Sequence, residues 1–310
     1  MFIINSIAPI FLLIALGKLL YKTGFLPESF FKGVNKLVFW IALPALLISK
    51  ICVAQLEFST ISKIFLLASL GTLLTLALAW GVSKQLKLPT QKTGSFLQGT
   101  FRGNGAFIGL PVIIYTLGEL DPQAEILGTV VLAPLVILFN LLSVPTLSRY
   151  SSFKECKGAS LRNVLMQFIK NPLILACAIG LILNLSDLAL PCFAIRALNT
   201  LGNAALPLIL MSIGATLIIE RLSDTAPAAL IASVIKVAIA PSIGFLLAPL
   251  FNLEPTEKMI AIFYLACPTA VMSYVMAEAM GNDGPLAGRI VTLSTLLSGI
   301  TLPIIIAIGL

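Results

Sequence analysis

The 310-residue sequence contains no histidine and few charged side chains. Without an imidazole, the chain cannot form His-ligated zinc sites, Ser-His or Cys-His nucleophile pairs, or an HExxH metalloprotease site. Its five cysteines are dispersed with no CxxC spacing, which argues against both a metal site and a disulfide framework. It also lacks the GxGD aspartyl pair of intramembrane proteases. We therefore predict a protein that is not an enzyme and that holds no metal and no cofactor.

Charged residues make up 11% of the chain, whereas soluble domains carry about 25%. Hydrophobic residues account for 58%, and the mean hydropathy is +1.05. A helix needs ~20 mainly apolar residues to cross the bilayer core. About ten such helices with short connections would use the whole chain. The composition predicts an all-α polytopic membrane protein in a lipid bilayer and excludes secreted, fibrous, disordered and cytosolic proteins.

Apolar runs separated by polar, glycine or proline residues predict ten membrane spans. The first is interpreted as a retained span, because no basic segment precedes it and no A-x-A cleavage pattern follows it. The predicted spans cover residues 2–20, 33–50, 61–82, 93–118, 124–148, 170–185, 193–219, 227–250, 257–280 and 285–309.

The basic residues indicate the orientation of these spans. Lysine and arginine number 12 in the loops after spans 1, 3 and 5, against four in the first four even-numbered loops. Because cytoplasmic loops carry the excess of basic residues, both termini are predicted to lie outside the cytoplasm of a multi-pass protein in the cell (inner) membrane. The net charge of +7 is thus a topology signal, and no nucleic-acid partner is expected.

The two halves of the sequence share landmarks at a shift of 163 residues. Pro9 then aligns with Pro172, and Pro122 aligns with Pro285. A local shift also aligns Pro89-Thr90-Gln91-Lys92 with Pro255-Thr256-Glu257-Lys258, where the fourth span of each half opens. We predict one five-helix repeat at 1–149, a cytoplasmic connecting loop at 150–168 and a second repeat at 169–310. The competing interpretation is that membrane helices tolerate shared prolines without any repeat.

An odd number of spans in each repeat makes the second repeat inverted relative to the first. Inverted repeats are typical of secondary transporters, in which discontinuous helices meet near the midplane at the substrate site. We therefore predict ten transmembrane helices in two inverted five-helix repeats, with helices 4 and 9 broken and crossing.

Spans 4 and 9 contain the residues expected to break them. Glycine and asparagine near Arg102–Gly105 disfavour helix, and Pro111 removes a further hydrogen bond, so a second half-helix is expected from about Ala106. In span 9, Pro268 is expected to start the second half-helix. Two half-helix N-termini would then present unpaired N–H groups to an anion. The glycines alternatively serve close helix packing, since they form GxxxG spacings.

Two cations lie deep in the predicted spans. Arg102 is about 15 Å into span 4 at 1.5 Å per residue, and Lys236 is at similar depth in span 8. A charge at such depth costs at least ~2.5–3.5 kcal/mol and usually marks an ion or substrate path. Their natural partner is an anionic solute, unless an acid such as Glu278 neutralises one of them or Lys236 extends its ammonium toward the interface.

Several motifs resemble the auxin efflux carrier family, the PIN-like membrane transporters that include bacterial malate and malonate permeases. The motifs span nearly the whole chain: Ala8-Pro9 with Gly17, Gly24-Phe25-Leu26-Pro27, Ala42-Leu43-Pro44, Gly103 to Pro111, Cys267-Pro268-Thr269-Ala270, and Leu293 to Ser298 leading to Leu302-Pro303. The resemblance implies broken spans 4 and 9 crossing at a substrate site, with spans 3–5 and 8–10 sliding against a scaffold of spans 1, 2, 6 and 7. It carries the crossover residues over to Asn104, Pro111 and Pro268, and it implies a homodimer.

The sequence favours a carrier that moves small organic anions, such as mono- or dicarboxylates, by elevator-type alternating access. A sodium-coupled symporter of the bile-acid type and an anion channel remain alternatives, and the coupling ion, H⁺ or Na⁺, stays open. Polar residues that would line the site include Asn140 and Ser273, although each alone is more often an interhelical hydrogen bond. The predicted substrate-binding residues are Arg102, Asn104, Gly105, Ala106, Pro111, Asn140, Lys236, Pro268, Thr269 and Ser273.

Overall fold

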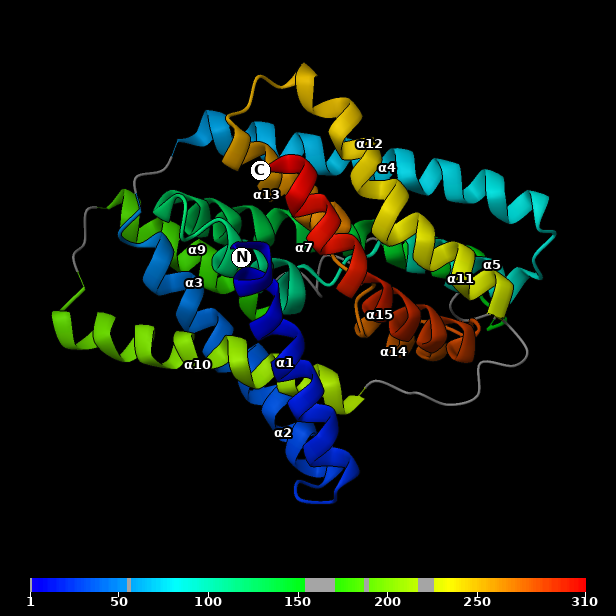
Figure 1. Cartoon of the computed structure of the whole chain (residues 1–310), viewed down its shortest axis with the longest axis horizontal. Helices are drawn as coiled ribbons and strands as arrows, with labels where there is room; N and C mark the ends of the chain where they lie inside the picture. The colour runs from blue at the N-terminus through cyan, green and yellow to red at the C-terminus, as the bar shows by residue number, and fades with distance from the viewer. Residues whose placement is uncertain (1, 55–56, 154–170, 187–189, 217–225) are drawn as a thin grey trace. The chain divides into compact units, whose positions relative to one another are not determined.

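The computed structural model describes residues 2–54, 57–153, 171–186, 190–216 and 226–310. Across these residues the regular secondary structure is helical, and a single isolated β-bridge is present (Figure 1). Six helices in this part of the chain are long and apolar enough to cross a membrane: Glu28–Ile51, Phe58–Gln85, Pro122–Arg149, Cys192–Thr216, Pro227–Leu250 and Gly284–Gly309. The prediction of an all-helical, multi-pass membrane protein is confirmed, while the count of ten spans and their inverted arrangement stay predictions. The predicted connecting loop at 150–168 falls largely outside the described residues.

The chain divides into two compact units, each made from separated stretches of sequence. The first comprises Met1–Ile61, Leu110–Pro134 and Leu165–Leu217. Its helices are α1 (Phe2–Lys22), α2 (Glu28–Leu37), the π-helical η1 (Val38–Ala42), α3 (Leu43–Ile51), α6 (Leu110–Thr116), the first part of α7 (Pro122–Arg149), α9 (Pro172–Leu185) and α10 (Cys192–Thr216).

Close backbone contact holds the first unit together. A Cβ at Gly17 would collide with the carbonyl of Met211, and one at Gly214 would collide with the carbonyl of Ile14. Helices α1 and α10 therefore touch through their main chains, the kind of packing that small residues allow in membranes.

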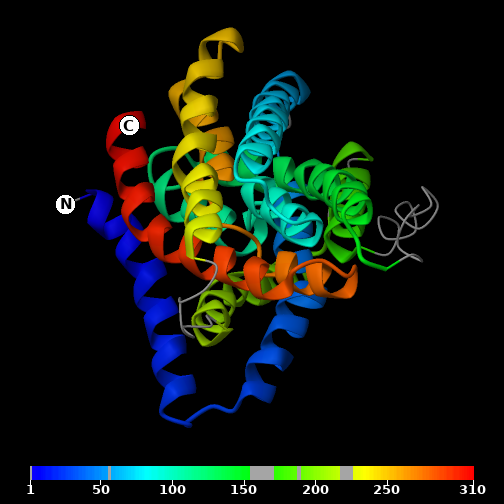
Figure 2. The ribbon, with the colours of Figure 1, turned by 90° about the vertical axis from the view of Figure 1, so that its right-hand side faces the viewer.

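The second unit comprises Ser62–Gly109, Leu135–Val164 and Ile218–Leu310. Its helices are most of α4 (Phe58–Gln85), α5 (Thr90–Phe101), the π-helical η2 (Gly105–Gly109), the last part of α7, α11 (Ala226–Val234), the π-helical η4 (Ile235–Ile239), α12 (Ala240–Leu247), the 3₁₀ turn η5 (Ala248–Leu250), α13 (Pro255–Ala266), α14 (Met272–Ala279) and α15 (Gly284–Gly309). Helices α11 and α15 are packed against each other (Figure 2, yellow and red). The core between them and α5 is built from Phe96, Leu97, Ala232 and Ile290.

Each of the three π-helical segments ends two residues before a proline: η1 before Pro44, η2 before Pro111 and η4 before Pro241. Proline has no N–H to donate and its ring clashes with the carbonyl four residues earlier. Widening the preceding turn to the i→i+5 pattern lets the helix continue through the proline without a break. Pro111 therefore adjusts the helix that follows the interruption in span 4 and does not itself cause that interruption.

Candidate functional site at two paired helix interruptions

The first interruption covers residues 102–104, between the end of α5 at Phe101 and the start of η2 at Gly105. Arg102 leaves the helix with extended dihedral angles, φ −77° and ψ 91°. The carbonyl of Asn104 accepts the N–H groups of both Ile108 (2.9 Å) and Gly109 (3.0 Å), so it starts the next helical segment. The predicted break near Arg102–Gly105 is confirmed, and helix resumes one residue before the predicted Ala106.

The second interruption covers residues 267–271, between the end of α13 at Ala266 and the start of α14 at Met272. Cys267 is extended, with φ −59° and ψ 143°. The prediction that Pro268 starts the second half-helix is wrong, because Pro268 lies inside the interruption. Its carbonyl is needed there as a hydrogen-bond acceptor.

The two interruptions are hydrogen-bonded to each other. Gly103 and Thr269 form an antiparallel β-bridge. The N–H of Asn104 donates to the carbonyl of Pro268 at 2.7 Å, and the N–H of Ala270 donates to the carbonyl of Arg102 at 2.9 Å. Backbone groups that leave a helix inside a membrane must find partners within the protein. Each interruption therefore supplies the partners that the other one needs.

Thr269 is fully buried and is committed to holding this arrangement. Its hydroxyl donates to the carbonyl of Gly99 at 2.6 Å, and its N–H donates to the hydroxyl of Ser294 at 3.0 Å. We expected unpaired N–H groups at these helix tips, and for Asn104, Thr269 and Ala270 that expectation is wrong. Thr269 thus has a structural role, and the sequence analysis missed its partner Ser294 as a site residue.

Arg102 is 9% exposed and its guanidinium points toward α7. One Nη donates to Asn140 Oδ1 at 2.9 Å and to Ser143 Oγ at 3.0 Å. Its Nε is buried and has no hydrogen-bond partner. The structure therefore brings the predicted residues Arg102 and Asn140 together and adds Ser143, which the sequence analysis did not single out.

Lys236 is 1% exposed and lies on η4. Its ammonium donates to the carbonyl of Leu265 in the last turn of α13, and it lies 3.3 Å from the position that a Cβ on Gly103 would take. The side chain therefore ends beside the paired interruptions, and the alternative that it extends toward the membrane interface is wrong.

Neither buried cation has an acidic partner in the described part of the chain. The ion pairs found there join Lys32 to Glu28 and Lys50 to Glu125. Glu278, the acid considered as a neutralising partner, is hydrogen-bonded to Tyr274. Two positive charges thus lie at the interruptions, with neutral hydrogen-bond partners only.

Uncommitted polar groups lie on the same helices. The Asn104 side chain is buried and makes no hydrogen bond to any described residue, and the hydroxyl of Ser273 on α14 is buried without a partner. The sequence analysis missed Gln98, one helical turn before Arg102, whose Nε2 is 3.8 Å from Met276 Sδ and whose Oε1 has no partner. A buried amide four residues before a mid-span arginine was the available signal.

The remaining predicted residues divide between the two units. Gly105 is buried and Ala106 is half-buried, both at the start of η2 in the second unit. Pro111 belongs to the first unit, so it is not part of the cluster formed by the other predicted residues.

An all-helical membrane protein with two buried cations at paired helix interruptions has the features of a solute transporter. Comparison with known proteins agrees with this class. A family model described as "Membrane transport protein" matches residues 2–153 and 154–306. The chain belongs to this membrane transport protein family, the auxin efflux carrier family of the sequence resemblance.

Two curated relatives extend over nearly the whole chain. An uncharacterized transporter of Methanocaldococcus jannaschii is 26% identical over 295 residues, which cover 93% of each chain. An uncharacterized transporter of Methanothermobacter thermautotrophicus is 25% identical over 305 residues, covering 97% of this chain and 96% of the relative. Both similarities agree with transport as the general function.

Proposed function

We propose that this transporter is a secondary carrier of small organic anions, such as mono- or dicarboxylates, and that it works by elevator-type alternating access. The observation that carries the proposal is the pair of buried cations, Arg102 and Lys236, beside the two interruptions without an acidic partner among the described residues. Removing a cation from water is costly unless a counter-charge compensates it. A carboxylate from the solute would supply that charge.

The available donors fit a carboxylate. An arginine fork binds carboxylates through parallel N–H···O bonds, and Arg102 has a buried Nε without a partner. Its Nη bonds to Asn140 and Ser143 orient the guanidinium and do not neutralise it. Asn104, Gln98 and Ser273 would add neutral hydrogen bonds that distinguish one acid from another.

The hydrogen bonds between the interruptions support inverted repeats. Gly103 and Thr269 are 166 residues apart, the same separation as Pro89 and Pro255, where the fourth span of each half opens. At that shift Asn104 corresponds to Ala270, and Arg102 corresponds to Pro268. The two hydrogen bonds of the bridge, from Asn104 to Pro268 and from Ala270 to Arg102, therefore exchange with each other under a two-fold rotation.

The half-helices that lead into the interruptions also correspond. Helices α5 and α13 each have 12 residues and each starts at or beside the shared proline. This supports ten spans in two inverted repeats, at 1–149 and 169–310, with the interruptions in spans 4 and 9. The orientation with both termini outside the cytoplasm, the inner-membrane location and a homodimer belong to the same proposal.

An elevator mechanism requires that the site moves as one body. Arg102, Lys236 and both interruptions lie in the second compact unit. The hydrogen bonds between α5, α13 and α15 through Thr269 tie them together. A unit built in this way can carry a bound anion without disturbing the geometry of its binding groups.

A binding screen tests the substrate class. The purified protein is heated with malate, malonate, lactate or indole acetate, and with malonamide as an uncharged analogue of malonate. We expect at least one acid to raise the melting temperature and to drive saturable uptake into proteoliposomes, while malonamide does neither. Stabilisation by malonamide equal to that by malonate, or by none of the acids in a wider carboxylate panel, would contradict an anion site.

The transport assay separates the alternatives. Uptake that requires sodium would favour a sodium-coupled symporter, and unitary currents would favour a channel. Uptake that responds to a pH gradient alone would identify H⁺ as the coupling ion.

A further inference from the structure

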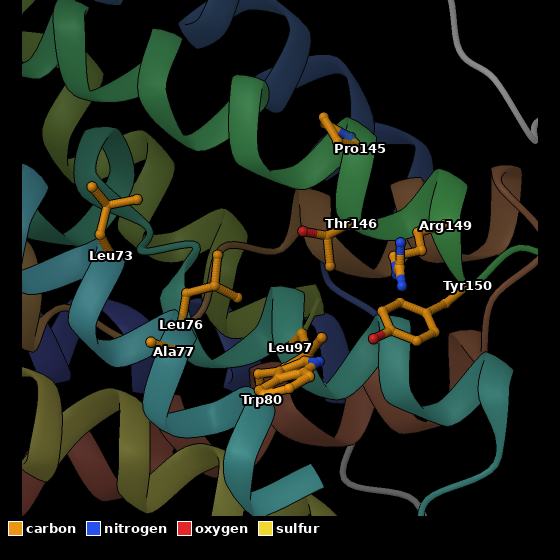
Figure 3. Close-up of a pocket in the computed structure, with 9 residues that line it drawn as sticks. All are labelled: Leu73, Leu76, Ala77, Trp80, Leu97, Pro145, Thr146, Arg149 and Tyr150. Carbon is orange, nitrogen blue, oxygen red and sulfur yellow. The ribbon is translucent and has the colours of Figure 1, made fainter. Parts of the chain in front are cut away.

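A groove runs along the surface of the second unit between α4, α5 and α7 (Figure 3). Its cavity volume is about 450 Å³. Helix α4 contributes Leu73, Leu76, Ala77 and Trp80, whose spacing of three and four residues places them on one helix face. None of these residues belongs to the paired interruptions, so the groove is a separate feature.

The two ends of the groove differ in chemistry. Leu73 and Trp80 are seven residues apart on α4, or about 10 Å at the rise of an α-helix. The Leu73 end is apolar. Figure 3 shows the guanidinium of Arg149 and the ring of Tyr150 close together on the α7 side of the Trp80 end. The groove therefore combines an apolar channel with a polar, aromatic-lined end.

The polar end is positively charged. Arg149 is exposed and forms no ion pair with any described residue. Lys84 adds a second cation, with its Nζ 5.6 Å from the centroid of the Trp80 ring. Arg149 is the last residue of α7, and Trp80 and Lys84 lie in the last two turns of α4. Tryptophan, tyrosine and basic residues at the ends of membrane helices are typical of the membrane–water interface.

We propose that this groove binds one anionic phospholipid from the surrounding bilayer, with an acyl chain along Leu73, Leu76 and Ala77 and the phosphate at Arg149. Charge complementarity and position determine this choice of occupant. Helices α4 and α7 both qualify as membrane spans, so their exposed apolar face meets lipid chains. A cationic end at the interface attracts anionic headgroups, and the apolar lining offers a free phosphate nothing that water lacks.

Lipid binding to the purified protein in detergent provides the test. Native mass spectrometry and melting temperature are measured during titration with phosphatidylglycerol, with phosphatidylcholine of the same acyl chains, and with glycerol 3-phosphate. We expect phosphatidylglycerol to remain bound and to raise the melting temperature, phosphatidylcholine to bind more weakly, and glycerol 3-phosphate to have no effect. An equal response to glycerol 3-phosphate would overturn the proposal in favour of a free phosphate site.

Two variants locate the site. Arg149→Gln should weaken phosphatidylglycerol binding about five-fold, the effect expected for one basic residue near an anionic surface. Arg196→Gln is the matched control, because Arg196 is an exposed arginine on α10 in the other unit. Ala77→Phe fills the apolar channel and should displace the lipid while Arg149 stays in place. Unchanged phosphatidylglycerol binding in either Arg149→Gln or Ala77→Phe would overturn the proposal.

Discussion

The interruption at residues 102–104 and the interruption at residues 267–271 share one backbone arrangement but carry different side chains. Each donates one N–H to the other and accepts one in return. The first contains Arg102 and Asn104, whereas the second contains Cys267, Pro268 and Thr269. The first interruption therefore holds a cation and an uncommitted amide, while the second holds neutral groups that lock the crossing in place.

The missing charge of the second interruption comes from another helix. Lys236 reaches the crossing from η4, where the helix is widened ahead of Pro241. Two cations thus approach a nearly symmetric backbone from unrelated positions in the sequence. The comparison teaches that symmetry determines the frame of the site, while the binding groups are asymmetric. Variants of the first interruption should accordingly change anion affinity, and variants of the second should change stability.

Arg102→Gln should have the largest effect. Loss of a charge-assisted hydrogen bond to a carboxylate costs roughly 1.5–3 kcal/mol, so affinity for the transported acid should fall about 10- to 150-fold. Titration of the purified variant by melting temperature or calorimetry measures this change. Arg196→Gln serves as the control for general loss of positive charge and should bind the acid like the unmodified protein. Equal affinity in the two variants would remove Arg102 from the site.

Gly103→Ala should disrupt the crossing itself. The added Cβ would lie 2.7 Å from the Sγ of Cys267 and 3.1 Å from the carbonyl of Tyr264. Overpacking of this kind costs about 1–3 kcal/mol, so the melting temperature should fall even in the absence of any ligand. Gly33→Ala is the matched control, because a Cβ at Gly33 meets no atom within 4 Å. Equal melting temperatures for the two variants would show that the interruptions are not tightly paired.

Lys236→Met should separate charge from packing. Methionine keeps the length of the side chain and removes the buried ammonium, so folding stability should stay equal or rise. Affinity for the acid should fall about ten-fold, equivalent to ~1.4 kcal/mol, if the ammonium contributes to the positive potential. The two measurements are made on the same preparation. Unaltered affinity would limit the anion site to the first interruption.

Thr269→Val should have the smallest effect and the opposite pattern. The variant keeps the shape of the side chain but loses the hydroxyl bond to Gly99. We expect a stability loss of about 1 kcal/mol with little change in anion affinity. A large drop in affinity with unchanged melting temperature would show instead that the Thr269 hydroxyl contacts the substrate.

Much of the helical framework could be predicted from the sequence. The predicted span 124–148 corresponds to α7 at Pro122–Arg149, and the predicted span 285–309 corresponds to α15 at Gly284–Gly309. These boundaries are readable because apolar length and flanking polar residues are local properties. The first interruption was also readable, since Gly103, Asn104 and Gly105 all have low helix propensity.

The partners within the site could not be predicted in the same way. Thr269 faces Gly99 and Ser294, and Arg102 faces Ser143, through contacts between distant parts of the chain. A local pattern assigns Pro268 to a helix start, but the backbone bridge uses its carbonyl and keeps it outside the helix. The sequence revealed which residues are unusual, and only the tertiary arrangement shows whether each one binds its neighbours or remains available.

The bridge between Gly103 and Thr269 has a consequence for biogenesis. During synthesis the first interruption enters the membrane 166 residues before its complement is translated. Until then the N–H of Asn104 and the carbonyl of Arg102 lack the partners that they have in the finished protein. The nascent first half must therefore be sheltered by water or by the insertion machinery until the ribosome delivers the second half.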